Sequence, residues 1–176
     1  MRCNNSQGPR ILVAGLGNDL LRDDGVGVHV VRELQKNQLH GAIVLEVGSS
    51  VLSALHAIEW ADKILAIDAM KAHGVPGTIY LSHDVRSIEE PERRASLHEL
   101  NFLAVLSFIP PARQRRPDVL ILGIEPETID YGLTLSPSVQ AAVPTAVSTV
   151  RVIVESWRNG GEAMDAIERQ GQTSLE

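Results

Sequence analysis

The sequence predicts a single three-layer α/β domain, in which a twisted, mostly parallel sheet of about five strands lies between layers of helices. Two observations lead to this fold class. Short runs rich in Val, Ile and Leu alternate with longer segments whose apolar residues recur at helical spacing. Hydrophobic residues make up 44% of the 176 residues and aromatic residues only 3%, so the chain can bury one sizeable, aliphatic core.

The first strand is expected to begin at Ile11. The run Ile11–Leu16 is apolar or small throughout, which is typical of a buried strand. Gly15 and Gly17 allow the backbone to turn tightly after it. A helical pattern then covers Gly25–Lys36, so the first unit is a strand, a glycine loop and a helix.

The other strands are expected from short apolar runs that are bounded by turn residues. These runs are Ala42–Val47, Lys63–Ile67, Gly77–Leu81 and Val119–Gly123. The run Lys63–Ile67 reads as a buried strand and ends in Asp68. Gly77–Leu81 follows a proline and a glycine turn, and it is the candidate for one edge strand that runs antiparallel.

Two helices are predicted from capping residues in the middle of the chain. Ser49 is expected to cap a short helix whose apolar positions are Leu52, Leu55 and Ile58. The run Asp84–Arg94 is charged and without period, so it is expected to be a loop. Ser96-Leu97-His98-Glu99 then matches a capping box and opens a helix that runs to about Phe108.

The last helix is expected to begin at Ser136-Pro137, a cap followed by proline in the first turn. It should run to about Trp157, with a kink or short break at Pro144. Gly160-Gly161 is expected to end the ordered part. The organisation is therefore a flexible N-terminal tail over residues 1–10, a single α/β domain over 11–159 and a polar, frayed C-terminal tail over 160–176.

Charge and cysteine content exclude several classes of function. The net charge is −6 and no long basic run occurs, which argues against nucleic acid and anionic membrane surfaces as partners. No apolar run is long enough to span a membrane, and Met1–Arg10 has no apolar core of a secretory signal. The single cysteine, Cys3, excludes a disulfide within one chain, so we expect a cytoplasmic protein, with a monomer as the default state.

Candidate functional residues follow the first and third predicted strands. Asp23 and Asp24 come after the first strand and its glycine loop, and Asp68 ends the third strand. In a parallel sheet with helices on both faces, ligands bind beyond the carboxyl ends of the strands, so Asp24 and Asp68 are expected to line a site there. The simpler alternative for Asp23 or Asp24 is that it caps the following helix.

His98 is the candidate imidazole at this site. It lies in the first turn of its predicted helix, where the helix dipole disfavours the protonated ring and leaves a nitrogen able to bind a metal. Two carboxylates and one imidazole suit a borderline divalent ion and leave coordination positions open. The other five histidines are expected to be surface residues, namely His29, His40, His56, His73 and His83.

Other readings of the same motifs are less well supported. The glycine loop lacks the third glycine of a dinucleotide fingerprint because Leu20 stands there, and adjacent aspartates would repel a pyrophosphate. A nucleotide-binding oxidoreductase is therefore only a third alternative. His98-Glu99 is followed by Leu-Asn-Phe rather than by the spacing of His-Glu-x-x-His, and no Gly-x-Ser-x-Gly elbow occurs.

These motifs together resemble the maturation endopeptidases of nickel–iron hydrogenases. The resemblance extends from Ile11 to about Trp157. Its segments are the glycine-asparagine loop with Asp23-Asp24-Gly25-Val26-Gly27, then Ala66-Ile67-Asp68-Ala69, Leu97-His98-Glu99-Leu100 and Leu122-Gly123-Ile124-Glu125-Pro126-Glu127. One departure is Glu46-Val47-Gly48, where the family usually has Asp-Gly-Gly, so we leave Glu46 out of the ligand set.

The resemblance implies a metal-dependent endopeptidase that removes a C-terminal extension from the nickel-loaded large-subunit precursor of a hydrogenase. It implies that Asp24, Asp68 and His98 are both the metal ligands and the catalytic residues. The nickel would arrive with the substrate, and other divalent ions are compatible with the same ligands. The alternative is a non-catalytic nickel-binding or docking module for hydrogenase assembly, and a role for Asp23 as a base stays open.

Overall fold

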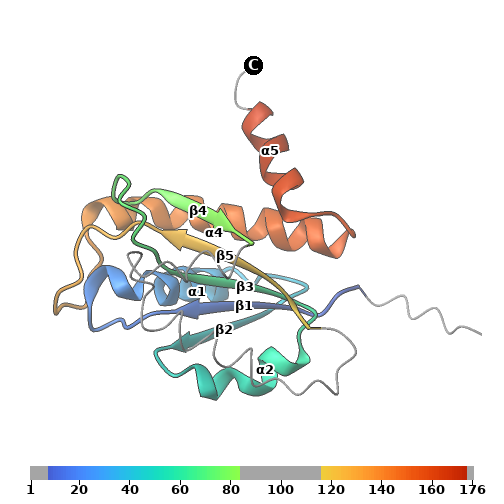
Figure 1. Cartoon of the computed structure of the whole chain (residues 1–176), viewed down its shortest axis with the longest axis horizontal. Coiled ribbons are helices and arrows are strands. Elements are labelled where there is room, and N and C mark those ends of the chain that lie inside the picture. Colours follow the sequence, from blue (N-terminus) through green and yellow to red (C-terminus); the bar gives the residue numbers. More distant parts are fainter. Residues whose placement is uncertain (1–7, 84–115, 174–176) are drawn as a thin grey trace, which may run out of the picture.

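A five-stranded sheet forms the centre of the computed structural model, which describes residues 8–83 and 116–173 (Figure 1). The strands are β1 (Ile11–Leu16), β2 (Ile43–Gly48), β3 (Lys63–Ala69), β4 (Ile79–Ser82) and β5 (Asp118–Ile124). Their order in the sheet is β2-β1-β3-β5-β4. All neighbours are parallel except β4, which pairs antiparallel with β5 at the edge. The predicted α/β sheet with one antiparallel edge strand is thus confirmed.

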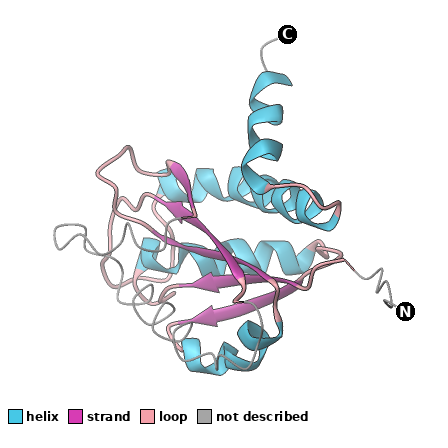
Figure 2. Ribbon diagram, turned by 45° about the vertical axis from the view of Figure 1, so that its right-hand side comes forward, coloured by secondary structure: helices cyan, strands magenta, loops and turns pink. Residues whose placement is uncertain are grey.

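Helices cover both faces of this sheet, as Figure 2 shows. The 3-10 turn η1 (Arg22–Gly25) leads into α1 (Val26–Lys36), and η2 (Val51–Ala54) leads into α2 (Leu55–Trp60). The C-terminal helices are α4 (Pro137–Arg158) and α5 (Ala163–Thr173). The loop expected over Asp84–Arg94 and the helix expected from Ser96 to Phe108 lie outside the described residues.

Alternation along the strands divides the core into two layers. Ile11 and Val13 of β1 pack with α1 and α4, whereas Leu12 and Ala14 pack with Ile58 of α2 on the opposite face. All of these side chains are buried, as are nearly all residues of β3 and β5. The core is aliphatic as expected, with Trp157 as its one fully buried aromatic side chain among the described residues.

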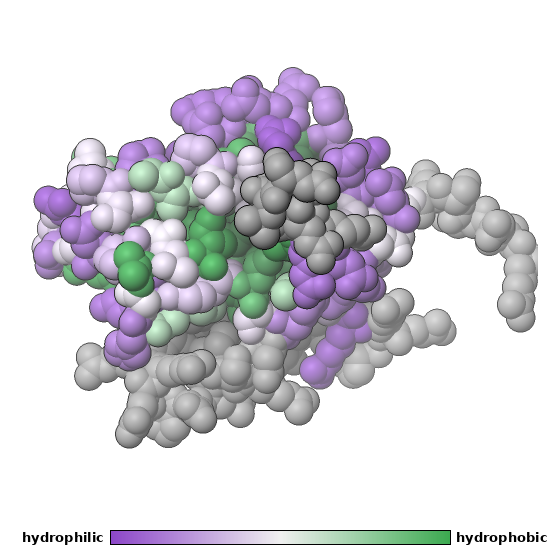
Figure 3. All heavy atoms as spheres, turned by 90° about the horizontal axis from the view of Figure 1, so that it is seen from above, coloured by the Kyte–Doolittle hydropathy of each residue, from purple (hydrophilic) through white to green (hydrophobic). Residues whose placement is uncertain are grey.

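The edge of the sheet at β4 lies on the side of α4 and α5. Ile79 and Leu81 are partly buried and pack against the core layer that contains α4. Seen from above in Figure 3, this side of the molecule carries apolar residues in its middle and hydrophilic residues around them. No helix among the described ranges combines the length and apolarity needed to cross a membrane.

Two expectations about helices are corrected in the middle and last parts of the chain. Ser49 is not a helix cap: the chain turns at Ser50 into the short η2, and Leu52 is exposed rather than on an apolar helix face. Of the kink or short break expected at Pro144, the break does not occur, because α4 continues through this residue without interruption. Pro144 and Gln140 are both exposed, so the carbonyl that loses its helical partner can bind water instead.

The C-terminal segment is a helix and not the frayed tail that its polarity suggested. After a turn at Gly160, where φ is +76°, the chain forms α5, which projects from the end of α4 (Figure 1). Ala163 is fully buried in the core and Ile167 packs against it. Two apolar residues one helical turn apart are enough to fix the start of α5, although the rest of the helix is polar.

Candidate active site

The loop between β1 and η1 positions Asp24 at the carboxyl end of the sheet. Gly17 has a φ of +106°, and a Cβ at this position would lie 1.8 Å from the carbonyl oxygen of Asp24, so only glycine fits. The Asn18 N–H donates to Oδ2 of Asp24 at 2.9 Å. The Asn18 side chain in turn accepts the N–H of Leu20 at 3.0 Å, which stabilises the turn. Asp24 is therefore a buried carboxylate held by a preformed loop.

Gly27 brings this loop onto the ends of two strands. A Cβ on Gly27 would lie 2.1 Å from the carbonyl oxygen of Ile67 and 2.5 Å from that of Leu16. The start of α1 thus rests directly on the backbone of β1 and β3. This close packing is the role that the third glycine plays in a dinucleotide fingerprint, but here it falls well after the position of Leu20.

Asp68 lies at the end of β3, next to the start of α1. The strand runs through Asp68 to Ala69, slightly further than the sequence indicated, and Asp68 stands opposite Gly123 of β5. Its side chain is fully buried, and Oδ1 accepts the N–H of Ala69 at 2.8 Å. Because Asp68 directly follows Ile67, on which Gly27 rests, the structure brings Asp24 and Asp68 to the same rim of the sheet.

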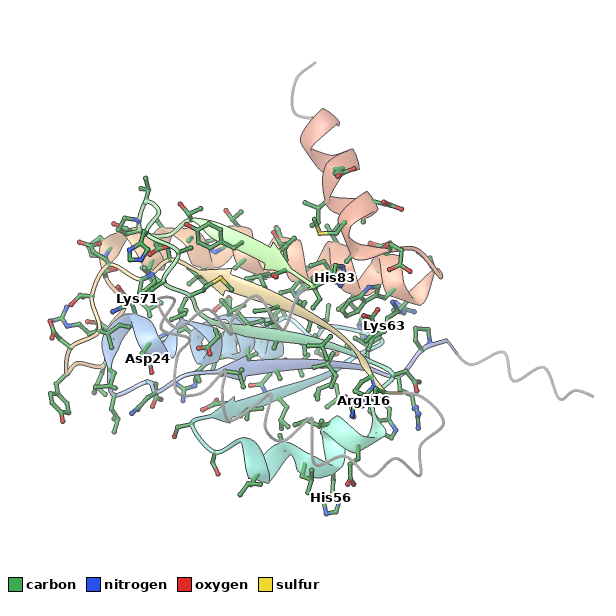
Figure 4. All side chains as sticks on the ribbon, in the orientation of Figure 1. Asp24, His56, Lys63, Lys71, His83 and Arg116 are labelled. Atoms are coloured by element: carbon green, nitrogen blue, oxygen red, sulfur yellow. The ribbon has the colours of Figure 1, made fainter. Side chains whose placement is uncertain are left out.

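His98 lies outside the described residues, so its place at the site stays a prediction. Within the described ranges no group of three His, Cys, Asp or Glu side chains is arranged to hold a metal ion. A metal site that used Asp24 and Asp68 would therefore need its further ligands from outside the described residues. Figure 4 shows Asp24 at the end of the molecule that also carries Lys71, opposite Lys63 and Arg116.

Asp23 has a structural role that the sequence did not reveal. Its fully buried carboxylate accepts three backbone N–H groups: Oδ2 accepts those of Glu127 and Thr128, both at 2.9 Å, and Oδ1 accepts that of Ser136 at 2.7 Å. It does not cap α1, whose N-cap is Gly25. Since its partners lie 104 to 113 residues along the chain, no local pattern could have predicted these bonds.

Glu125 holds the loop after β3 by accepting backbone N–H groups, as Asp23 holds the loop after β5. This buried carboxylate follows β5, and its Oε2 accepts the N–H groups of Ala72 and Gly74 at 2.8 and 3.2 Å. It also accepts the hydroxyl of Tyr80 at 3.0 Å. Loss of solvent, together with this hydrogen bond, raises the pKa of Tyr80 above its usual value of 10.0. The segment that follows Asp68 is therefore fixed by Glu125.

Glu46, which we left out of the ligand set, forms a salt bridge with Arg32. Arg32 donates to both its carboxylate oxygens, at 2.6 and 2.9 Å, and also to Asp19 at 2.8 Å. The hydrogen bonds to Glu46 and Asp19 raise the pKa of the Arg32 guanidinium. Partial burial and the positive charge of Arg32 lower the pKa of His29 below 6.5. His29 is half-buried, whereas the other four described histidines are exposed, as expected.

Comparisons with known sequences identify proteins of hydrogenase maturation or formation. Residues 28–152 match the family model described as hydrogenase maturation protease, a span that includes Asp68 and His98 and begins just after Asp24. The chain is 30% identical to the hydrogenase expression/formation protein HoxM of Azotobacter vinelandii, over 86% of this chain and 78% of that protein. It is 28% identical to the hydrogenase 2 maturation protease of Escherichia coli, over 80% and 88% of the two chains.

Solved structures agree with the sequence comparisons. The hydrogenase maturating endopeptidase HybD from Escherichia coli superposes with a TM-score of 0.70 at 27% identity, covering 80% of this chain and 89% of that one. The [NiFe] hydrogenase maturation protease HybD from Thermococcus kodakarensis superposes with a TM-score of 0.69 at 29% identity, covering 80% and 96%.

Proposed function

The chain belongs to the hydrogenase maturation protease family, and we propose that it removes a C-terminal extension from the large-subunit precursor of a nickel–iron hydrogenase. Family membership supports the peptidase activity and the class of substrate. The names of the similar proteins refer to hydrogenase maturation, and one of them to the nickel–iron enzymes. The structural observation that carries the proposal is the pair of buried carboxylates, Asp24 and Asp68, at one rim of the sheet.

We further propose that cleavage depends on a divalent ion. Peptide hydrolysis requires a polarised carbonyl group and an activated water molecule, and a divalent ion can provide both. Asp24 and Asp68 offer hard oxygen ligands, and His98 would add a nitrogen, which together suit a borderline ion such as nickel. The loops hold the two carboxylates in place before substrate arrives, so little reorganisation is needed on binding.

In this proposal the nickel is part of the substrate. A nickel ion that is already held by the precursor would bind Asp24, Asp68 and His98 through its open positions, and this would place the adjacent C-terminal segment at the rim. Cleavage would then occur only after nickel insertion. The water adds to the carbonyl carbon, the C–N bond breaks and the released amine takes a proton. We place the reaction in the cytoplasm, as the single cysteine suggests, with a monomer as the default state.

The test is to incubate the purified chain with a large-subunit precursor, with and without nickel, and to weigh the products by mass spectrometry. Loss of a C-terminal peptide only in the nickel-loaded sample is the expected result. Equal cleavage of the nickel-free precursor would contradict the requirement for nickel. Binding without any change in mass would favour the docking module over the protease.

The matched variant is Asp68→Asn, which keeps the shape of the side chain and removes its charge. We expect cleavage to fall by at least about a hundredfold, because a neutral amide is a poor ligand for a divalent ion. Circular dichroism and the unfolding midpoint serve to show that the variant is folded. An Asp68→Asn chain that processes the precursor at the normal rate would remove Asp68 from the catalytic set.

A further inference from the structure

Exposed apolar side chains gather on two loops next to Asp24. Of the nine large hydrophobic residues that are exposed in the described ranges, four lie on the β1–η1 and β5–α4 loops. These are Leu20 at 57% exposure, Ile129 at 36%, Tyr131 at 90% and Leu133 at 69%. The other five are spread over different elements. We call Leu20, Tyr131 and Leu133 the apolar platform.

Backbone hydrogen bonds join the two loops at this platform. The N–H of Gly132 donates to the carbonyl of Leu20 at 3.0 Å, and the N–H of Arg22 donates to the carbonyl of Gly132 at 2.9 Å. These bonds form a single parallel β-bridge between Leu21 and Gly132. In this parallel register Leu20 lies beside Tyr131, and Arg22 lies beside Leu133, so the three exposed side chains belong to two adjoining segments.

The platform is rigidly connected to the candidate site. Asp23 binds the amides of Glu127 and Ser136, which are near the two ends of the β5–α4 loop. Arg22 has a φ of +47°, a strained conformation for a non-glycine residue that surrounding contacts have to maintain. Its side chain lies over Gly132, where a Cβ would be 2.9 Å from Nε. The segment that makes the bridge is thus the one that leads directly into Asp24.

We propose that the apolar platform is the docking surface for an extended, apolar segment of the large-subunit precursor, next to the bond that is cleaved. This inference rests on the proposed function, because it identifies the occupant through the rim that the platform adjoins. A chain seated at Asp24 must pass close to Arg22 and so to the bridged loops. Exposed Tyr and Leu side chains would bind apolar residues of that chain.

The size of the platform favours a peptide segment over a second copy of the protein. A few side chains of this kind offer on the order of 400 Å². A stable interface between two folded proteins buries roughly 800 Å² on each partner. The platform alone is therefore too small for a stable dimer, but it is of a size to bind a few consecutive residues of an extended chain.

The test compares a double variant, Tyr131→Ser with Leu133→Ser, with a control, Met164→Ser, which removes an exposed apolar side chain from α5, at the end of the molecule opposite Asp24. Binding of the full chain to the nickel-loaded large-subunit precursor is measured by biolayer interferometry, and cleavage is followed in parallel. We expect the double variant to raise Kd by about tenfold or more, and to raise KM by a larger factor than it lowers kcat. The control should change neither.

Two results would overturn the docking surface: an unchanged Kd in the double variant, or a fall in kcat at constant KM. Wild-type self-association in analytical ultracentrifugation that the double variant abolishes would also overturn it, since the occupant would then be a second copy. Failure of the proposed function gives a different result, because a wild-type chain that binds the precursor without cleaving it contradicts the protease and still allows Kd values to be compared.

Discussion

The two ends of the central sheet hold carboxylates in different ways. At the amino ends of the strands, Asp62 accepts from the guanidinium of Arg10 at 2.6 and 2.9 Å, and Asp118 accepts from Lys63 at 2.9 Å. These cations also lie over indole rings, with Arg10 at 5.8 Å from the centre of Trp60. The side chains of Arg10 and Asp62 are both close to half exposed, so solvent screens their attraction.

At the carboxyl ends, the buried carboxylates of Asp23 and Glu125 accept hydrogen bonds from neutral groups. Asp23 accepts three backbone amides, and Glu125 accepts two amides and the phenol of Tyr80. Neutral donors fix the position of an oxygen without cancelling its charge. The amino rim therefore stabilises the fold through partly exposed ion pairs. At the carboxyl rim the exposed Asp19 and Glu46 pair with Arg32, but the buried Asp23 and Glu125 keep negative charge in a fixed geometry, which is what a cation site requires.

The prediction with the largest expected effect compares two variants, each of which removes one carboxylate from one end of the sheet. Asp23→Ala would leave the buried N–H of Ser136 and the partly buried N–H groups of Glu127 and Thr128 without their acceptor, and we expect it to lower the free energy of unfolding by about 3–5 kcal/mol. Asp62→Ala should lower it by only about 0.2–1 kcal/mol, because its ion pair is exposed. Urea denaturation of both variants gives the two values, and similar losses would contradict the distinction between the rims.

A second test concerns the close packing that brings Asp24 to the end of β3. Gly27→Ala would force a methyl group against the carbonyl oxygens of Ile67 and Leu16, and the backbone has to move. We expect a loss of about 1–3 kcal/mol in unfolding free energy, together with loss of precursor cleavage. The control is Gly160→Ala, which has positive φ but open space around it and should cost about 1 kcal/mol without affecting cleavage. Normal cleavage by Gly27→Ala would contradict a requirement for this packing.

The sequence predicts the fold more fully than it predicts the contacts of the carboxylates at the carboxyl ends of the strands. The apolar runs of β1, β3 and β5 are local signals, and so are the glycines at the end of β1, which is why the sheet and the position of Asp24 and Asp68 could be expected. The roles of Asp23 and Glu125 depend on amides that lie far away in the chain, and no local pattern encodes them. The same is true of α5, because its polar composition conceals the one buried turn that anchors it.

The prediction with the smallest expected effect compares how salt changes the energy of one interaction at each end of the sheet. A double-mutant cycle of Arg10→Met and Asp62→Asn should give a coupling energy of about 0.2–1 kcal/mol at low ionic strength, falling toward zero in about 1 M sodium chloride. A cycle of Tyr80→Phe and Glu125→Gln should give a coupling of about 1–3 kcal/mol that changes little with salt, since the hydrogen bond is to a buried carboxylate. Thermal unfolding of the wild type and of the three variants in each cycle supplies both numbers. The contrary outcome is a coupling between Tyr80 and Glu125 that falls with salt as steeply as that between Arg10 and Asp62. In that case the carboxyl ends of the strands would be as open to solvent as the amino ends. Their fixed negative charge would then be screened before any cation arrived.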